Sequence, residues 1–287
     1  MLIFLDVYLI LLLKFAHGYK DAKIFGGKNC DVTRYPFYIY LEYYVNSAKF
    51  MCGGSLLSVE TVLTAGHCCA DAISITAYSG FIRNNRNYDQ TSNAIIPPKL
   101  HPNFTSYTLE SDLCIIQLEK PFKLTKRTKL VTLSPKKMLH EMMENENESK
   151  LYELQLMGYG VNKQDDGGEY LVDDSLGFQC TNSYLRTQKK CLEEINDSTE
   201  RSKYSVKTMF CHYNPENNRT KGSCEGDSGS PIIYGNTQVG LISWGPNEEV
   251  CTKRMEVAAR LDVYYDWIQQ NGIKKRLRGF RSGLNHT

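Results

Sequence analysis

The sequence has almost no net charge. Its 34 lysine and arginine residues face 32 aspartate and glutamate residues, which leaves a formal charge of +2 at pH 7. A protein that holds nucleic acid through its phosphates needs a clear excess of basic residues. The charge therefore argues against a nucleic-acid-binding protein.

Long apolar runs are absent as well. The apolar core at Val7–Leu13 is much shorter than the roughly 20 residues that a membrane-spanning helix needs. It is followed by Lys14 and by the small-residue stretch Ala16–Gly18, so residues 1–18 predict a signal peptide. The early Asp6 and the lack of a basic start are atypical, and a signal anchor, which would leave the protein attached to the membrane, is the alternative.

No Cys-x-x-Cys pair occurs among the ten cysteines, which are dispersed along the chain. That arrangement argues against a structural metal site. Ten cysteines together with five glycosylation sequons instead indicate a disulfide-bonded, secreted, extracellular glycoprotein. The sequons begin at Asn103, Asn147, Asn196, Asn218 and Asn285.

The segment Lys221–Pro231 contains a serine, Ser228, between Asp227 and Gly229. A serine hydroxyl is a weak nucleophile that needs a neighbouring base and a site for the oxyanion formed on attack. Gly226 has no Cβ, so its N–H can turn toward a substrate carbonyl. By itself, however, this segment is equally typical of a surface turn.

Two further residues supply what a nucleophilic serine needs. His67 ends the stretch Leu63–His67, and Asp112 begins the apolar run that continues to Leu118. A histidine base takes the proton of the serine, and an acid behind it orients the imidazole. With His67, Asp112 and Ser228 in that order, the chain resembles the trypsin/chymotrypsin family of serine proteases from Ile24 to about Asn271.

The resemblance implies an all-β fold of two antiparallel six-stranded β-barrels with a C-terminal helix, formed by residues 24–272, with the three residues in the cleft between the barrels. The residue patterns alone indicate only many short strands. Examples are Tyr35–Leu41, Ile73–Tyr78, Leu154–Gly160 and Thr237–Ser243.

A helix is predicted over Asp262–Gly272. Asp262 would cap it, Tyr264, Trp267 and Ile268 would share one face, and Gly272 would end it. Polar loops are predicted at Glu141–Lys150 and Lys163–Ser175.

The resemblance also implies disulfide pairs. They are Cys30–Cys180, Cys52–Cys68, Cys191–Cys211 and Cys224–Cys251. Leu154 and Tyr234 occupy both positions of another bridge common in the family.

Cys69 and Cys114 remain. They stand two residues after His67 and Asp112, so contact between those two residues would bring the cysteines together. We predict a fifth bridge, Cys69–Cys114; two buried free thiols are the alternative, and spacing alone does not decide between them.

By the same resemblance, residues 19–23 form an activation propeptide. Cleavage after Lys23 by an activating protease would free the amine of Ile24, which would then pair with buried Asp227 and order the loop around Ser228. The alternative is that Lys23-Ile24 merely starts a strand.

The resemblance implies that the backbone N–H groups of Gly226 and Ser228 form the oxyanion hole. The floor of the specificity pocket would be Gly222, where enzymes that cut after Lys or Arg usually carry an aspartate. The pocket walls would come from Ser243-Trp244-Gly245 and from Glu256. We expect an acidic pocket that accepts Lys or Arg, alone or together with aromatic residues. If Glu256 turned to solvent, the pocket would be apolar.

No cofactor is expected. The family's calcium loop would correspond to Tyr78–Tyr88, which contains no Asp or Glu, so we predict no metal there. The expected partners of a monomeric protease are protein or peptide substrates, the activating protease and protein inhibitors. The basic tail, residues 273–287, is expected to be solvated, with a polyanion or membrane surface as the alternative partner.

Four positions depart from the family pattern without removing a reacting group. They are Phe25, Gly66, Tyr159 and Ser230. Ser230 adds bulk near Ser228. The alternative function is a catalytically inactive homologue with a binding or regulatory role; such homologues usually lose the serine, histidine or aspartate, and this chain keeps all three.

Overall fold

The computed structural model describes residues 24, 26–81, 87–144, 151–161, 163–164, 170–171, 177–215, 221–245, 251 and 255–273. The predicted signal peptide and propeptide, and residues 274–287 of the basic tail, lie outside them. So do Phe25, the sequons Asn147, Asn218 and Asn285, and part of the expected calcium loop.

The N-terminal half forms one antiparallel sheet with the strand order β6-β5-β2-β3-β4-β8-β7. Its strands are β2 (Tyr38–Val45), β3 (Ala48–Ser58), β4 (Thr61–Thr64), β5 (Ser74–Ser79), β6 (Gln90–Asn93), β7 (Lys99–Leu100) and β8 (Cys114–Gln117). The sheet curls, and a bridge between Ala94 and Leu118 joins the segments that follow β6 and β8.

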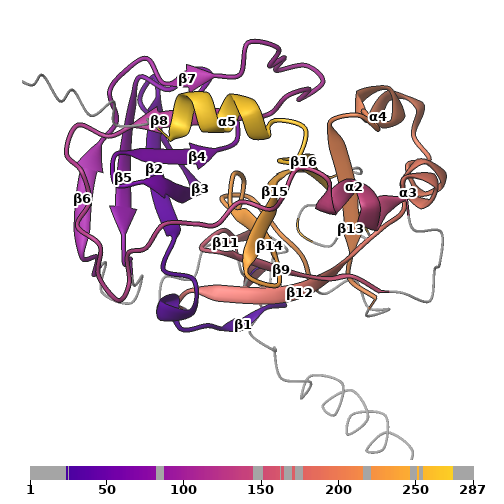
Figure 1. The fold of residues 1–287 in the computed structure, drawn as a ribbon, viewed down its shortest axis with the longest axis horizontal. Helices are drawn as coiled ribbons and strands as arrows, with labels where there is room; N and C mark the ends of the chain where they lie inside the picture. The colour runs from indigo at the N-terminus through magenta and orange to yellow at the C-terminus, as the bar shows by residue number, and fades with distance from the viewer. Residues whose placement is uncertain are drawn as a thin grey trace, which may run out of the picture.

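The C-terminal half forms a second sheet in which β9 also pairs with β12, so β9, β12, β13, β16, β15 and β14 close into a barrel of six strands, with β1 added to β12. The strands are β1 (Lys28–Asn29), β9 (Glu153–Gly158), β12 (Gln179–Leu185), β13 (Met209–Tyr213), β14 (Pro231–Tyr234), β15 (Thr237–Trp244) and β16 (Met255–Arg260). The predicted all-β architecture is confirmed, with one closed barrel and one curled sheet side by side (Figure 1).

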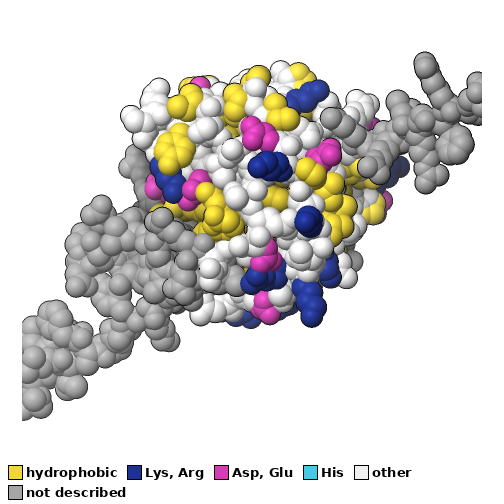
Figure 2. Space-filling view, turned by 90° about the vertical axis from the view of Figure 1, so that its left-hand side faces the viewer, with side chains coloured by type: hydrophobic (Ala, Val, Ile, Leu, Met, Phe, Trp, Pro, Cys, Tyr) yellow, Lys and Arg dark blue, Asp and Glu magenta, His cyan; other side chains and the backbone are white. Residues whose placement is uncertain are grey.

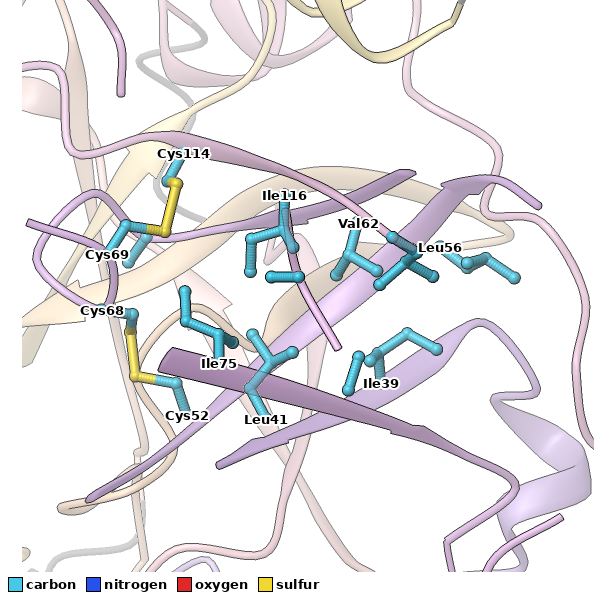
Figure 3. Packing of buried hydrophobic residues seen from close by; sticks show 14 of the residues in the cluster. Ile39, Leu41, Cys52, Leu56, Val62, Cys68, Cys69, Ile75, Cys114 and Ile116 are labelled. Atoms are coloured by element: carbon cyan, nitrogen blue, oxygen red, sulfur yellow. A yellow bond between two sulfur atoms is a disulfide. The ribbon is translucent and has the colours of Figure 1, made fainter. Parts of the chain in front are cut away.

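Each half has an apolar core built by the alternation of inward-facing residues along its strands. In the first sheet, Ile39, Leu41, Leu56, Val62 and Ile116 point toward one another, and two disulfides lie at one end of this cluster (Figure 3). In the second, Leu154 is buried and the partly buried Tyr234 packs against the same cluster, so apolar packing occupies the place of the missing bridge.

Helices are short and lie outside the sheets. They are the 3₁₀ turn η1 (Val32–Arg34) and the α-helices α2 (Met138–Met143), α3 (Gln188–Glu194), α4 (Ser198–Lys203) and α5 (Tyr265–Gly272). Helix α5 lies beside β4 and β8 of the first sheet (Figure 1). Its last residue, Gly272, accepts a 2.5 Å hydrogen bond from Thr61 Oγ1, which fixes the end of the chain to the first half.

Three local predictions were wrong. Asp262 does not cap α5, because the helix begins at Tyr265 and Asp262 instead forms a buried ion pair with Arg260, 2.6 Å away. Residues 141–143, the start of the predicted loop, instead form the end of α2, where Met142 and Met143 are buried. The segment 163–175 contains a short hairpin, β10 (Lys163–Gln164) with β11 (Tyr170–Leu171).

On the face drawn in Figure 2, basic and acidic side chains are interspersed among the described residues. Among the described residues, no helix is long and apolar enough to cross a membrane.

Candidate active site

The pairing of β4 with β8 brings His67 and Asp112 together. Thr64 at the end of β4 is opposite Cys114 at the start of β8, so the residues just after one strand meet those just before the other. His67 Nδ1 lies 2.9 Å from Asp112 Oδ2, and the backbone N–H of His67 donates to Oδ1, also at 2.9 Å. Two contacts to one carboxylate hold both the imidazole and its backbone.

Disulfides fix the segments on both sides of this contact. Cys52–Cys68 ties the His67 segment to β3, and Cys69–Cys114 ties the same segment to the first residue of β8. The remaining pairs are Cys30–Cys180, Cys191–Cys211 and Cys224–Cys251, so the five pairs are those expected from the sequence. Cys52 and Cys68 lie near the imidazole, but as a disulfide they offer no thiolate to a metal.

The Ser228 loop lies against the same segment. Gly53 of β3 donates a 2.8 Å hydrogen bond to the carbonyl of Ser228. Gly229 has a φ of +74°, and a Cβ there would lie 2.8 Å from the backbone nitrogen of Ala65, two residues before His67. Only glycine allows this approach. The described residues show no hydrogen bond between Ser228 Oγ and the imidazole.

Ser243 has a role that the sequence reasoning missed. It was predicted as part of the pocket wall, yet its hydroxyl donates a 2.5 Å hydrogen bond to Asp112 Oδ2. Its neighbour Ile242 exchanges backbone hydrogen bonds with Gly229 and Ser230. One strand end, that of β15, therefore contacts both the acid and the serine loop.

These contacts set the ionisation of the pair. Burial lowers the pKa of His67, but the charge of Asp112 and the hydrogen bond to it more than offset this and raise the pKa above its ordinary value. Burial by itself raises the pKa of Asp112. The charge and hydrogen bonds of His67, together with the hydrogen bond from Ser243, outweigh burial, and the pKa of Asp112 lies below its ordinary value. The arrangement favours a carboxylate beside an imidazole with increased proton affinity.

Asp227 is fully buried beneath the Ser228 loop. It accepts hydrogen bonds from the backbone N–H of Gly160 at 2.8 Å and of Cys224 at 3.0 Å. Ile24 is buried in the core of the second barrel. In the uncleaved chain the nitrogen of Ile24 belongs to a peptide bond, so the expected ion pair with Asp227 requires cleavage after Lys23.

Gly226 has a φ of +90°, and its missing side chain leaves room for Met51, whose Sδ would lie 2.7 Å from a Cβ at this position. A larger residue would meet both backbone strain and this contact. Glycine is therefore the residue that permits this loop conformation next to Ser228.

Glu256 faces the base of the expected specificity pocket. It lies on β16, only 5% exposed, and its Oε1 accepts a 2.5 Å hydrogen bond from the backbone N–H of Ser223. The same oxygen occupies the space where a Cβ of Gly222 would lie. Glu256 thus turns inward to Gly222 and Ser223, and an aspartate could not be accommodated at Gly222 without moving it. Trp244 and Gly245 are half-buried beyond Ser243; the loop between them and Cys251 is outside the described residues.

Three departures from the family pattern fit together with their neighbours. Ser230 Oγ lies 3.3 Å from the hydroxyl of Tyr38 and occupies the space that the missing Cβ of Gly53 leaves. Tyr159 donates a hydrogen bond to the carbonyl of Phe81. Gly66 packs against the ring of Phe104. None of them displaces a candidate reacting group.

Comparison with known proteins agrees with this geometry. The family described as Trypsin matches residues 24–268. The chain is 30% identical over 257 residues to trypsin of Sus scrofa, covering 87% of this chain and 96% of that protein. It is 27% identical over 254 residues to trypsin-10 of Gadus morhua, with coverages of 87% and 91%.

Solved structures show the same fold. The structure titled HL collagenase has a TM-score of 0.70 at 23% identity, covering 87% of this chain and 99% of that one. The structure titled GrC has a TM-score of 0.69 at 22% identity, with coverages of 85% and 97%. With the family matched over most of its length, this chain belongs to the trypsin family of serine endopeptidases.

Proposed function

We propose that the protein is a secreted serine endopeptidase, made as a zymogen, in which His67, Asp112 and Ser228 form the catalytic triad. The observation that carries the proposal is the joint contact of Asp112 with His67 Nδ1 and Ser243 Oγ, next to the Ser228 loop. Secretion is supported by the five disulfides, which persist in oxidising compartments.

The proposed reaction follows from the positions of these groups. With Nδ1–H directed to Asp112, Nε2 of His67 carries the lone pair and removes the proton of Ser228 Oγ as it attacks the substrate carbonyl. The N–H groups of Gly226 and Ser228 stabilise the oxyanion. His67 then protonates the leaving amine. In the second half-reaction His67 removes a proton from water as it attacks the acyl-enzyme, the bond between the acyl carbon and Ser228 Oγ breaks, and His67 returns the proton to Oγ.

Zymogen activation would depend on Asp227. Its carboxylate is fully buried and accepts two backbone hydrogen bonds, and a new ammonium at Ile24 would add an opposite charge beside it. We propose that this pairing holds the Ser228 loop in its active form. Conversion of Lys23 to Gln should prevent processing, and the purified Lys23→Gln protein should remain inactive when treated with a protease that cleaves after lysine.

The preferred P1 residue would be Lys or Arg, with aromatic residues also accepted. The support is the burial of Glu256 and its orientation toward Gly222 and Ser223. A poorly solvated carboxylate favours a cationic partner.

The test is labelling of the processed enzyme with a serine-directed phosphonate, followed by peptide-library profiling. We expect covalent labelling of Ser228, and loss of both labelling and peptide cleavage in Ser228→Ala. A matched control is Ser58→Ala, because the hydroxyl of Ser58 forms a hydrogen bond with Thr61 outside the site. Proteolysis that survives Ser228→Ala would exclude the mechanism.

A further inference from the structure

The loop from β7 to β8 passes beside the candidate triad. Its Phe104 packs against Gly66, the residue before His67: a Cβ at Gly66 would lie 2.7 Å from the Phe104 ring. The same Cβ position is 3.1 Å from Oδ1 of Asp112, which belongs to the same loop. A group attached to the residue before Phe104 therefore stands close to the contact between His67 and Asp112.

That residue is Asn103, the acceptor of the sequon Asn103–Thr105. Asn103 and Thr105 are both exposed. The backbone N–H of Asn103 donates to Nδ1 of the buried His101 at 3.2 Å. Its side-chain amide makes no hydrogen bond within the described part of the chain. The backbone at Asn103 is thus held in place, while the amide nitrogen is open to modification.

The other sequon within the described residues begins at Asn196, which is also exposed. It precedes Asp197, the N-cap of α4, in the second half of the chain (Figure 1). No hydrogen bond or ion pair among the described residues joins Asn196 to the candidate triad. Of these two sequons, Asn103 is the one placed to affect the reaction, and Asn196 provides a matched control.

An exposed sequon in a secreted protein is an acceptor for an N-linked oligosaccharide, which is bulky and polar. The donor is an oligosaccharide linked to a lipid through a diphosphate. Nδ2 of Asn103 forms a bond to the anomeric carbon of the donor and loses one proton. The bond from that carbon to the diphosphate oxygen breaks, and the lipid diphosphate leaves with the electron pair. The side chains of His67 and Asp112 are chemically unchanged.

We propose that Asn103 carries an N-linked glycan that restricts access to the triad by size, so that flexible segments are cleaved and folded proteins are disfavoured. This inference rests on the proposed function of a secreted peptidase. A flexible segment can enter beside the glycan, whereas a folded substrate must bring its own surface against the β7–β8 loop. The glycan hinders that orientation, which lowers the association rate, and hence kcat/KM, for the folded substrate alone.

Occupancy is tested on the full-length protein secreted from eukaryotic cells. An amidase that removes N-linked glycans converts the modified asparagine to aspartate, and in heavy-oxygen water the new carboxyl group carries a mass label. We expect peptide mass spectrometry to find this label at Asn103. Unmodified Asn103 in the secreted protein would overturn the proposal.

The size restriction is tested with one scissile sequence, selected by peptide-library profiling and presented both as a short peptide and within a surface loop of a folded carrier protein. Asn103→Gln and Thr105→Ala each remove the sequon. We expect both to raise the carrier-to-peptide ratio of kcat/KM several-fold and to leave peptide cleavage unchanged. Thr105→Ser keeps the sequon, and Asn196→Gln removes only the other one, so both should retain the wild-type ratio.

Enzymatic removal of the glycans from the folded, processed wild-type enzyme should raise the ratio in the same way, and it decides the question should a variant not be secreted. An unchanged ratio, or an equal rise in Asn196→Gln, would overturn the size restriction while the peptidase function stands. If neither substrate is cleaved and the phosphonate does not label Ser228, the proposed function fails as well.

Discussion

Ser243 Oγ and His67 Nδ1 share one oxygen, Oδ2 of Asp112, at 2.5 and 2.9 Å. His67 and Asp112 belong to the first sheet, whereas Ser243 belongs to β15 of the second barrel. The acid is therefore satisfied only when the two halves are docked. The contact links the stability of the interface to the orientation of the imidazole.

Ser243→Ala tests this link. Loss of one hydrogen bond to a buried carboxylate should lower kcat/KM by about tenfold or more, and equally for Lys and Phe substrates, because the change acts on the imidazole and not on P1. Steady-state kinetics on two peptides that differ only in a P1 Lys or Phe provide the measurement. A selective loss with only one of them would assign Ser243 to the pocket wall instead.

The pH dependence of kcat/KM reports on His67. The base is active when neutral, and the charge of Asp112 raises its pKa against the opposing effect of burial, so activity should increase with pH through a midpoint above about 6.5. Asp112→Asn removes the charge and should shift that midpoint downward. It should also lower kcat by about 10⁴-fold, because the imidazole is no longer held in the required tautomer. A midpoint that stays in place in Asp112→Asn would contradict this account.

The Cys69–Cys114 disulfide should contribute stability without contributing to the chemistry. It closes a loop with a sequence separation of 45 residues. The double variant Cys69→Ala/Cys114→Ala should lose about 2–4 kcal/mol of unfolding free energy while retaining activity at low temperature. Urea denaturation of the double variant and the wild type gives the comparison. If the double variant were instead inactive while fully folded, the bridge would be needed for the His67–Asp112 geometry itself.

His212 should make the fold sensitive to acid. Its pKa is about 3 when buried and about 6.5 in the unfolded chain, so between these values only the unfolded chain takes up the proton. Stability is therefore lost as the pH falls from about 6.5 toward 3, by up to about 1.4 kcal/mol per pH unit from this residue. His212→Asn should have a shallower slope of unfolding free energy against pH. Parallel slopes for the two proteins would show that His212 is protonated in the folded state.

The resemblance carried by His67, Asp112 and Ser228 in that order implied the fold, the candidate triad and four of the disulfide pairs. The residue patterns alone indicated only many short strands and did not decide the Cys69–Cys114 bridge. Gly226, Asp227 and Ser228 are adjacent in the chain, and Cys69 and Cys114 follow His67 and Asp112 at equal spacing. Such local patterns indicate candidate catalytic and disulfide-bonded residues without knowledge of the structure. Local patterns can also mislead. The position of Asp262 before a helix predicts that it caps the helix, but in the structure it forms an ion pair with Arg260.

Only the tertiary structure decided which side chains meet across strands. Ser243 alternates along β15 like any wall residue, and nothing in its neighbourhood in the chain points to Asp112, 131 residues away. His212 looks like a core histidine until the register of β13 with β16 sets it opposite Glu256. A shift of one residue in that register would turn both side chains to the other face. Register follows from long-range packing of the whole barrel, and no local pattern encodes it.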